Sequence, residues 1–104
     1  MKIEPAYLEE IQEILLKNLD NIPVQCFFFG SRARGDSRPS SDLDILLKAD
    51  KELEFATLAN LRSDFEDSNL PFKVDLVDYH RIDEKFQHKI NQECVEFNYL
   101  KIFN

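Results

Sequence analysis

Three aspartates have the spacing and the surroundings that a cation site for phosphate chemistry requires. Asp42 and Asp44 lie two residues apart at the start of an apolar run, and Asp75 stands between Val74 and Leu76 in another. Residues i and i+2 of a strand point to the same face, with Cα atoms about 6.5–7 Å apart, so the first two carboxylates can meet at one ion. Asp75 can join them if the two strands are neighbours. An isolated Asp-x-Asp pair is more often a solvated strand start, so this reading needs support from nearby residues.

Three carboxylates this close together would repel one another, and that indicates what they bind. Two unit charges 4 Å apart interact by about 4 kcal/mol at an effective dielectric constant of ~20. Ligand sets made only of oxygen suit a hard cation such as Mg²⁺, which keeps water molecules and shares substrate phosphates. Zinc is not expected, because neither His80 nor His88 has ligand spacing with a cysteine.

A phosphate-binding turn is predicted upstream of the aspartates. Gly30 and Ser31 follow an apolar run and open a short helical turn. Free backbone N–H groups at such a turn bind phosphate, glycine allows close approach, and the Ser31 hydroxyl can donate to a phosphate oxygen. Arg32 and Arg34 make this stretch locally basic, which favours a small anion. An ordinary strand-to-helix turn with a serine cap is the alternative.

The spacing between the two motifs favours the functional interpretation. Ten residues separate Gly30-Ser31 from Asp42-Leu43-Asp44. The chance of this Gly-Ser-x10-Asp-x-Asp pattern in a chain this short is on the order of one in a thousand. Both halves also lie at strand ends, which would place phosphate donors beside metal-binding acids.

The elements that must position these residues can be read from hydrophobic periodicity. We expect helices over 5–19, 51–67 and 83–92, with Asp50 as the N-cap of the second. We expect strands over 24–29, 42–47 and 72–77, a helical turn over 31–34 that ends at Gly35, and a short extended tail. This order predicts an α/β (α+β) fold, a small mixed sheet flanked by helices, in a single domain over 1–104.

Composition excludes several classes of function. The 104 residues carry 13 basic and 20 acidic side chains, and the net charge of −7 disfavours direct binding to nucleic acid. No apolar run approaches the ~20 residues of a membrane-spanning helix, and the first ten residues lack the blocks of a signal peptide. Cys26 lies in an apolar run and is predicted to be a buried thiol in a reducing cytoplasm.

The stretch GSRARGDSRPSSDLDILL, residues 30–47, resembles the nucleotidyltransferases of the DNA polymerase β superfamily, with VDLVD at 74–78 as the strand of the third acid. More narrowly it resembles the minimal nucleotidyltransferases (MNT) that serve as antitoxins in HEPN/MNT toxin–antitoxin pairs. The resemblance implies a polymerase β-like fold, ATP as substrate, two Mg²⁺ ions and in-line displacement at the α-phosphate. Asp42 and Asp44 match the metal-binding pair, and Asp75 matches the third carboxylate, which shares the metal site and serves as general base.

The same resemblance implies roles for the residues of the turn. Gly30 and Ser31 match the triphosphate-binding turn, Arg34 matches a basic position common in the minimal members, and Arg32 is expected to assist. None of the three acids is replaced, which argues against an inactive homologue.

A chain of this size leaves little protein for an acceptor pocket, so the acceptor is expected on a partner or across an oligomer interface. The resemblance implies a HEPN-domain ribonuclease toxin, modified on a tyrosine and thereby silenced. The aromatic residues Phe97, Tyr99 and Phe103 could form that interface or pack on the domain's own core, and core packing is favoured for Phe97. Two alternatives stay open, namely an antitoxin that captures its toxin without catalysis and an adenylyltransferase for small molecules such as aminoglycosides.

Overall fold

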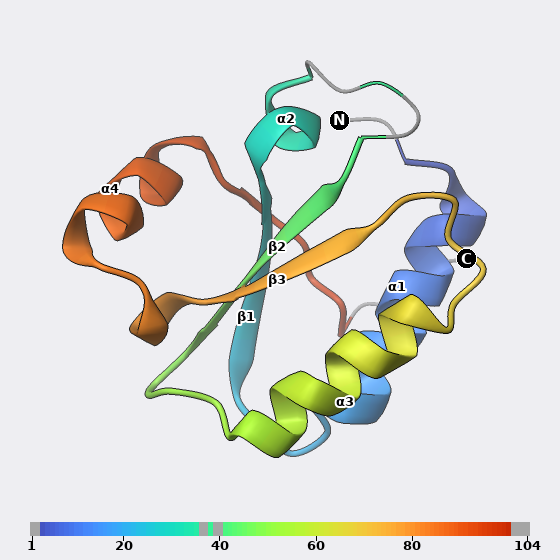
Figure 1. The fold of residues 1–104 in the computed structure, drawn as a ribbon, viewed down its shortest axis with the longest axis horizontal. Helices are drawn as coiled ribbons and strands as arrows, with labels where there is room; N and C mark the ends of the chain where they lie inside the picture. Colours follow the sequence, from blue (N-terminus) through green and yellow to red (C-terminus); the bar gives the residue numbers. More distant parts are fainter. Residues whose placement is uncertain (1–2, 36–37, 39–40, 101–104) are drawn as a thin grey trace.

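The computed structural model describes residues 3–35, 38 and 41–100. Its helices and strands follow one another along the chain as α1 (Pro5–Asn18), β1 (Val24–Phe29), α2 (Gly30–Arg34), β2 (Leu43–Ala49), α3 (Phe55–Glu66), β3 (Val74–Asp78), a 3₁₀ turn (Tyr79–Arg81), α4 (Glu84–Glu93) and β4 (Val95–Glu96) (Figure 1). Apart from the 3₁₀ turn, which was not predicted, this order of helices and strands is the predicted one. Across the described ranges, no helix combines the length and the apolar character needed to cross a membrane.

The four strands form one mixed sheet in the order β3-β2-β1-β4. β1 runs antiparallel to both β2 and β4, whereas β2 and β3 run parallel. Parallel neighbours need a crossover connection, and α3 supplies it. A small mixed sheet flanked by helices confirms the predicted fold class.

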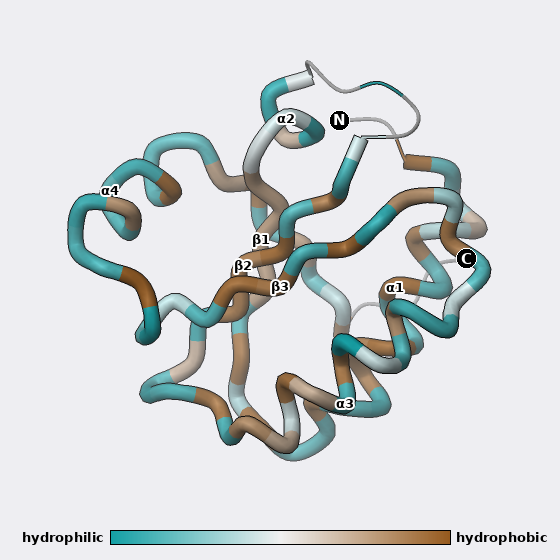
Figure 2. The backbone as a smooth tube through the Cα atoms, in the orientation of Figure 1, coloured by the Kyte–Doolittle hydropathy of each residue, from teal (hydrophilic) through white to brown (hydrophobic). Residues whose placement is uncertain are grey.

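Alternation along β2 divides the core into two layers. Leu43, Ile45 and Leu47 are fully buried in the larger cluster, together with residues of α1 and α3. Leu46 points to the other face, where it packs with Phe29 and Ile90 of α4. Figure 1 shows the sheet between α1 and α3 on one side and α4 on the other, and Figure 2 shows hydrophobic residues concentrated on the strands. Because side chains alternate along a strand, Asp42 and Asp44 share the face of Leu46, which is the α4 side.

The predicted start of the second long helix is wrong. The helix begins at Phe55 rather than at residue 51, and its N-cap is Glu54 rather than Asp50. The reason is a long-range contact, because the backbone N–H of Leu53 donates to Asp78 Oδ2 at 2.8 Å. Leu53 is itself buried in the core, so the segment before α3 is held against the end of β3 instead of winding into the helix.

The bounds of β2 and β3 also differ from prediction, by one residue at the start of β2 and at the end of β3 and by two at their other ends. β2 continues to Ala49, since its antiparallel pairing with β1 runs to the pair Val24–Ala49. β3 starts at Val74 rather than at residue 72, because its parallel pairing with β2 begins where Val74 meets Leu43. β1 spans the predicted residues, and α1 and α4 agree with prediction to within one residue at each end.

The tail packs on this chain's own core. β4 pairs with β1, the Phe97 ring stacks on Phe28 with centroids 4.8 Å apart, and the Tyr99 hydroxyl donates to the carbonyl oxygen of Val24 at 3.2 Å. Phe97 and Tyr99 are both buried. The interface interpretation is therefore wrong for these two residues, and core packing of Phe97 is confirmed. Phe103 lies outside the described residues.

Candidate active site

Two of the three predicted acids face each other across neighbouring strands. Asp44 on β2 is the register partner of Asp75 on β3. Parallel neighbours lie about 4.8 Å apart, and partners in register point to the same face, so both carboxylates project to the α4 side. Asp42 precedes β2 by one residue, is exposed, and shares this face because it is two residues from Asp44. The tertiary structure thus supplies the adjacency of strands that the sequence left open.

The predicted phosphate-binding turn meets the same carboxylates. Phe29, the last residue of β1, is paired with Asp44, so Gly30 follows directly beside the acid. Gly30 has a φ of +77°, and a Cβ built on it would overlap Oδ2 of Asp44. Only glycine fits this position, for reasons of both backbone conformation and space. Gly35 ends α2 with a φ of +82°, as predicted.

The electrostatics of Asp44 reflect this crowding. Burial is the largest influence and raises the pKa of its carboxyl group, and the negative charges of Asp75 and Asp42 raise that pKa further. The Arg34 guanidinium acts in the opposite direction and lowers the pKa of Asp44. The four groups therefore belong to one electrostatic cluster, in which acids exceed bases and a cation would relieve the repulsion.

The two predicted arginines have different environments. The side chain of Arg34 is 44% exposed and forms an ion pair with Glu93 at the end of α4, at 3.4 Å. Arg32 is only 5% exposed, donates from Nε to the carbonyl oxygen of Ser41 at 2.9 Å, and lies over the Phe72 ring. Its predicted role at a phosphate stays a prediction, as does that of Ser31, which is partly buried in α2.

Glu93 is a neighbour of the site, although the sequence favours a solvated acid at a helix end for this residue. Its carboxylate reaches Arg34 although 59 positions separate the two residues. No local pattern signals such a contact, because it depends on how α4 packs beside α2.

The donor atoms of the three aspartates fit a hard cation, since all of them are carboxylate oxygens. Within the described ranges, no group of three or more His, Cys, Asp or Glu side chains is already arranged to hold a metal ion. Asp75 instead lies 3.7 Å from the ammonium group of Lys73, in a largely exposed pair. The carboxylates are thus neighbours that would have to converge on an ion.

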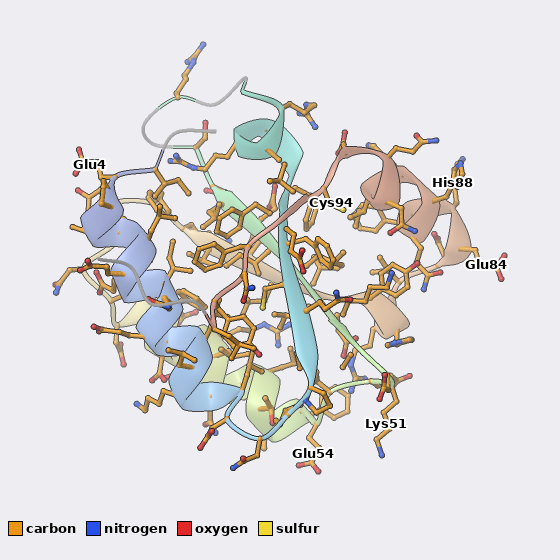
Figure 3. The ribbon with its side chains drawn as sticks, turned by 180° about the vertical axis from the view of Figure 1, so that it is seen from behind. Glu4, Lys51, Glu54, Glu84, His88 and Cys94 are labelled. Atoms are coloured by element: carbon orange, nitrogen blue, oxygen red, sulfur yellow. The ribbon has the colours of Figure 1, made fainter. Side chains whose placement is uncertain are left out.

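Other polar residues lie apart from this cluster. Asp78 is buried and accepts hydrogen bonds from the backbone of Leu53 and His80. His80 and His88 are exposed, and Figure 3 shows His88 on the outer side of α4. Cys26 is a buried free thiol, as predicted, and burial raises its pKa to about 12. A thiol with this pKa is not a nucleophile at neutral pH.

Comparisons with known proteins agree with this geometry. Residues 9–96 match the family model "Polymerase beta, Nucleotidyltransferase". A "Probable protein adenylyltransferase MntA" of Haemophilus influenzae is 36% identical over 67 residues, which are 64% of this chain and 59% of that protein. The chain thus spans about six-tenths of that relative's length.

Solved structures share the fold. One is the crystal structure of a toxin–antitoxin with AMP-PNP, at 28% identity and a TM-score of 0.62, covering 82% of this chain and 70% of the other. A second contains a tri-AMPylated Shewanella oneidensis HEPN toxin in complex with an MNT antitoxin, at 23% identity and a TM-score of 0.61, covering 86% and 69%. The family match extends over most of the chain and includes the turn and all three acids, so this chain belongs to the polymerase beta nucleotidyltransferase family.

Proposed function

We propose that this chain is an Mg²⁺-dependent adenylyltransferase that moves AMP from ATP to a tyrosine hydroxyl of a HEPN-domain toxin, and so acts as its antitoxin. The observation that carries the proposal is the register of Asp44 with Asp75, beside the Gly30 turn. The relative named as a protein adenylyltransferase and the toxin–antitoxin complex with AMP-PNP support the choice of reaction, of ATP and of partner. The proposed location is the cytoplasm, which agrees with two free cysteines.

Asp42, Asp44 and Asp75 are the residues proposed to hold Mg²⁺. Their oxygens suit this ion, and the repulsion by Asp75 and Asp42, which adds to burial in raising the pKa of Asp44, would fall when a cation binds. Two bound ions would neutralise the triphosphate and polarise the acceptor hydroxyl. The side chains of Asp42 and Asp75 are exposed enough to turn toward an ion, and Asp75 would leave the weak pair with Lys73.

Each residue of the cluster has a role in the proposed displacement. The backbone at Gly30 and the Ser31 hydroxyl hold the β- and γ-phosphates, and Arg34 offsets their charge. The acceptor oxygen attacks the α-phosphorus and forms a new P–O bond. The bond from the α-phosphorus to the bridging oxygen breaks, and pyrophosphate leaves. The acceptor's proton passes to the carboxylate of Asp75, which acts as general base.

The test is transfer of label from ATP in an extract of the host. The purified protein is incubated with ATP labelled at the α-phosphate or at the γ-phosphate, with and without Mg²⁺. We expect one protein band to carry the α-label and none to carry the γ-label, because AMP is transferred and pyrophosphate is released. Asp42→Asn should abolish the band. Asp50→Asn, at an exposed position just beyond the other end of β2, is the matched control and should leave it unchanged.

The alternatives predict different results. Protection of cells from the toxin by Asp42→Asn would favour capture without catalysis. Transfer of label from ATP to an aminoglycoside by the protein alone would favour a small-molecule enzyme. A labelled band that survives in Asp42→Asn would overturn the proposed mechanism.

A further inference from the structure

We propose that Arg32 is a positioning residue that holds the phosphate-binding turn and the two acid-bearing strand starts in one arrangement. The inference rests on the proposed function, because that function makes the arrangement of turn and acids a catalytic site. It differs from the role expected from the sequence, in which Arg32 assists at the phosphate.

The first contact of Arg32 fixes the start of β2. Arg32 lies in α2, and its Nε donates to the carbonyl oxygen of Ser41 at 2.9 Å. Ser41 directly precedes Asp42. The chain leaves α2 at Arg34 and returns at Ser41, so this hydrogen bond sets where the returning segment meets the turn. The position of Asp42 relative to Gly30 then depends on Arg32.

The second contact reaches the segment before β3. The guanidinium carbon of Arg32 lies 4.4 Å from the centre of the Phe72 ring. Phe72 is three residues before Asp75, and its ring also meets Tyr7 of α1 edge to face at 6.0 Å. The backbone N–H of Leu43 donates to the carbonyl oxygen of Lys73 at 2.8 Å, which joins the same two segments. Arg32 belongs to the phosphate-binding turn. Its side chain thus contacts both segments that lead to the acids, at Ser41 before Asp42 and at Phe72 before Asp75.

The chemistry of the guanidinium explains why arginine suits this place. Its plane can stack on an aromatic face while Nε donates in the plane, whereas a lysine ammonium is a point charge that cannot do both. Arg32 is 5% exposed, and a charge buried to this degree persists only with partners that compensate its desolvation. The observed contacts are of this compensating kind.

Arg34 provides the contrast. Its side chain is 44% exposed, pairs with Glu93 at 3.4 Å, and its charge acts on Asp44, so this charge lies beside the proposed site and would meet a phosphate that enters it. The two arginines, two positions apart on α2, therefore have different roles. Arg34 supplies charge to the substrate, and Arg32 sets the distances among the acids.

The variant Arg32→Lys tests whether the two arginines have these different roles, and Arg34→Lys is the matched comparison. Loss of a group that orients metal ligands typically lowers metal affinity by about 10–100-fold. For Arg32→Lys we expect Mn²⁺ binding, followed by electron paramagnetic resonance, to weaken ~10-fold, and kcat to fall while KM for ATP stays within about twofold. For Arg34→Lys we expect the opposite result, in which KM for ATP rises and the affinity for Mn²⁺ is unchanged. Phe72→Leu, which keeps an apolar side chain but removes the ring face, should reproduce the effect of Arg32→Lys more weakly.

The readouts separate this inference from the proposed function. A rise in KM for ATP with unchanged Mn²⁺ affinity in Arg32→Lys would mean that Arg32 binds phosphate, and would overturn the proposal. Unchanged Mn²⁺ affinity in both Arg32→Lys and Phe72→Leu would overturn it as well. If the wild-type protein neither transfers AMP nor binds Mn²⁺, the proposed function fails, and amide exchange at Leu43 decides the positioning role. Faster exchange at Leu43 in Arg32→Lys supports that role, and unchanged exchange contradicts it.

Discussion

Gly30, which follows β1, lies so close to the Asp44 carboxylate on β2 that no side chain fits between them. This contact joins the predicted phosphate-binding turn to the predicted metal-binding acids. A ligand with both phosphate and metal contacts would therefore span a short distance, which is the arrangement that transfer of AMP from a metal-bound triphosphate needs.

Gly30→Ala should damage both stability and transfer. The left-handed backbone costs a non-glycine residue about 1–2 kcal/mol, and the overlap with Asp44 adds roughly 1–3 kcal/mol. Transfer should fall by about 100-fold or more, because the substitution displaces the carboxylate of Asp44, a proposed Mg²⁺ ligand. Gly35→Ala is the control, since its φ is also positive but no atom lies within 4 Å of the new Cβ. Urea unfolding should give the larger loss for Gly30→Ala, and equal losses would contradict the steric argument.

Asp44→Asn should stabilise the protein at neutral pH when no divalent cation is present. The raised pKa of Asp44, caused first by burial and then by Asp75 and Asp42, means that the folded state holds this proton more tightly than the unfolded state. Stability from this group is present below the ordinary pKa and is lost as pH rises through the raised pKa. Thermal melts at several pH values should show wild type falling below the variant as pH rises.

Added Mg²⁺ should make the wild-type protein more stable than Asp44→Asn. Mg²⁺ at a concentration ten times its dissociation constant stabilises the native state by about 1.4 kcal/mol. Only the wild-type protein has the Asp44 carboxylate that full binding requires. Asp50→Asn should behave as wild type in the same melts. A variant that is less stable than wild type at pH 7 without metal would show that the repulsion at Asp44 is compensated by other contacts.

Asp78→Ala should destabilise the fold and leave AMP transfer per folded molecule unchanged. Asp78 is 5% exposed, accepts from the backbone of Leu53 and His80, and pairs with Arg81 Nε at 3.3 Å. Removal of a buried partner of this kind costs about 3–5 kcal/mol. Asp75→Ala should do the opposite, with a small stability change and no transfer. Urea unfolding and label transfer per folded molecule distinguish the two, and loss of transfer in folded Asp78→Ala would place Asp78 in the site.

The two thiols should react at very different rates. Cys26 is 1% exposed and its pKa is raised to about 12 by burial, whereas Cys94 is partly exposed. A chromogenic disulfide reagent should therefore modify one thiol quickly in the native protein and the second only after denaturation. Cys94→Ser should remove the fast phase. Rapid modification of Cys26 in that variant would indicate local opening of β1.

Much of the fold and of the site followed from short-range patterns. Alternation at 42–47 places Asp42 and Asp44 on one face, and helical periodicity identified three of the helices. The spacing from Gly30-Ser31 to the aspartate pair indicates phosphate chemistry without any knowledge of the fold. These features depend on residues within a few positions of one another, or on a motif with a fixed spacing.

Other features depend on partners distant in the sequence, and local patterns do not encode them. The start of α3 is decided by the bond from Leu53 to Asp78, 25 positions away, so a pattern that favoured residue 51 was overridden. The contact of Arg34 with Glu93 follows from the packing of α4 beside α2. The tail aromatics Phe97 and Tyr99 became core because β1 had an edge that β4 covers.

By itself, the sequence determined which residues could bind a cation and a triphosphate, because side-chain chemistry and periodicity are local properties. The tertiary structure decided that Asp75 stands opposite Asp44, that Gly30 touches that acid, and that the side chain of Arg32 is buried. Strand order and burial arise from the packing of the whole chain around one sheet, and this packing is a sum over long-range contacts that no short stretch contains.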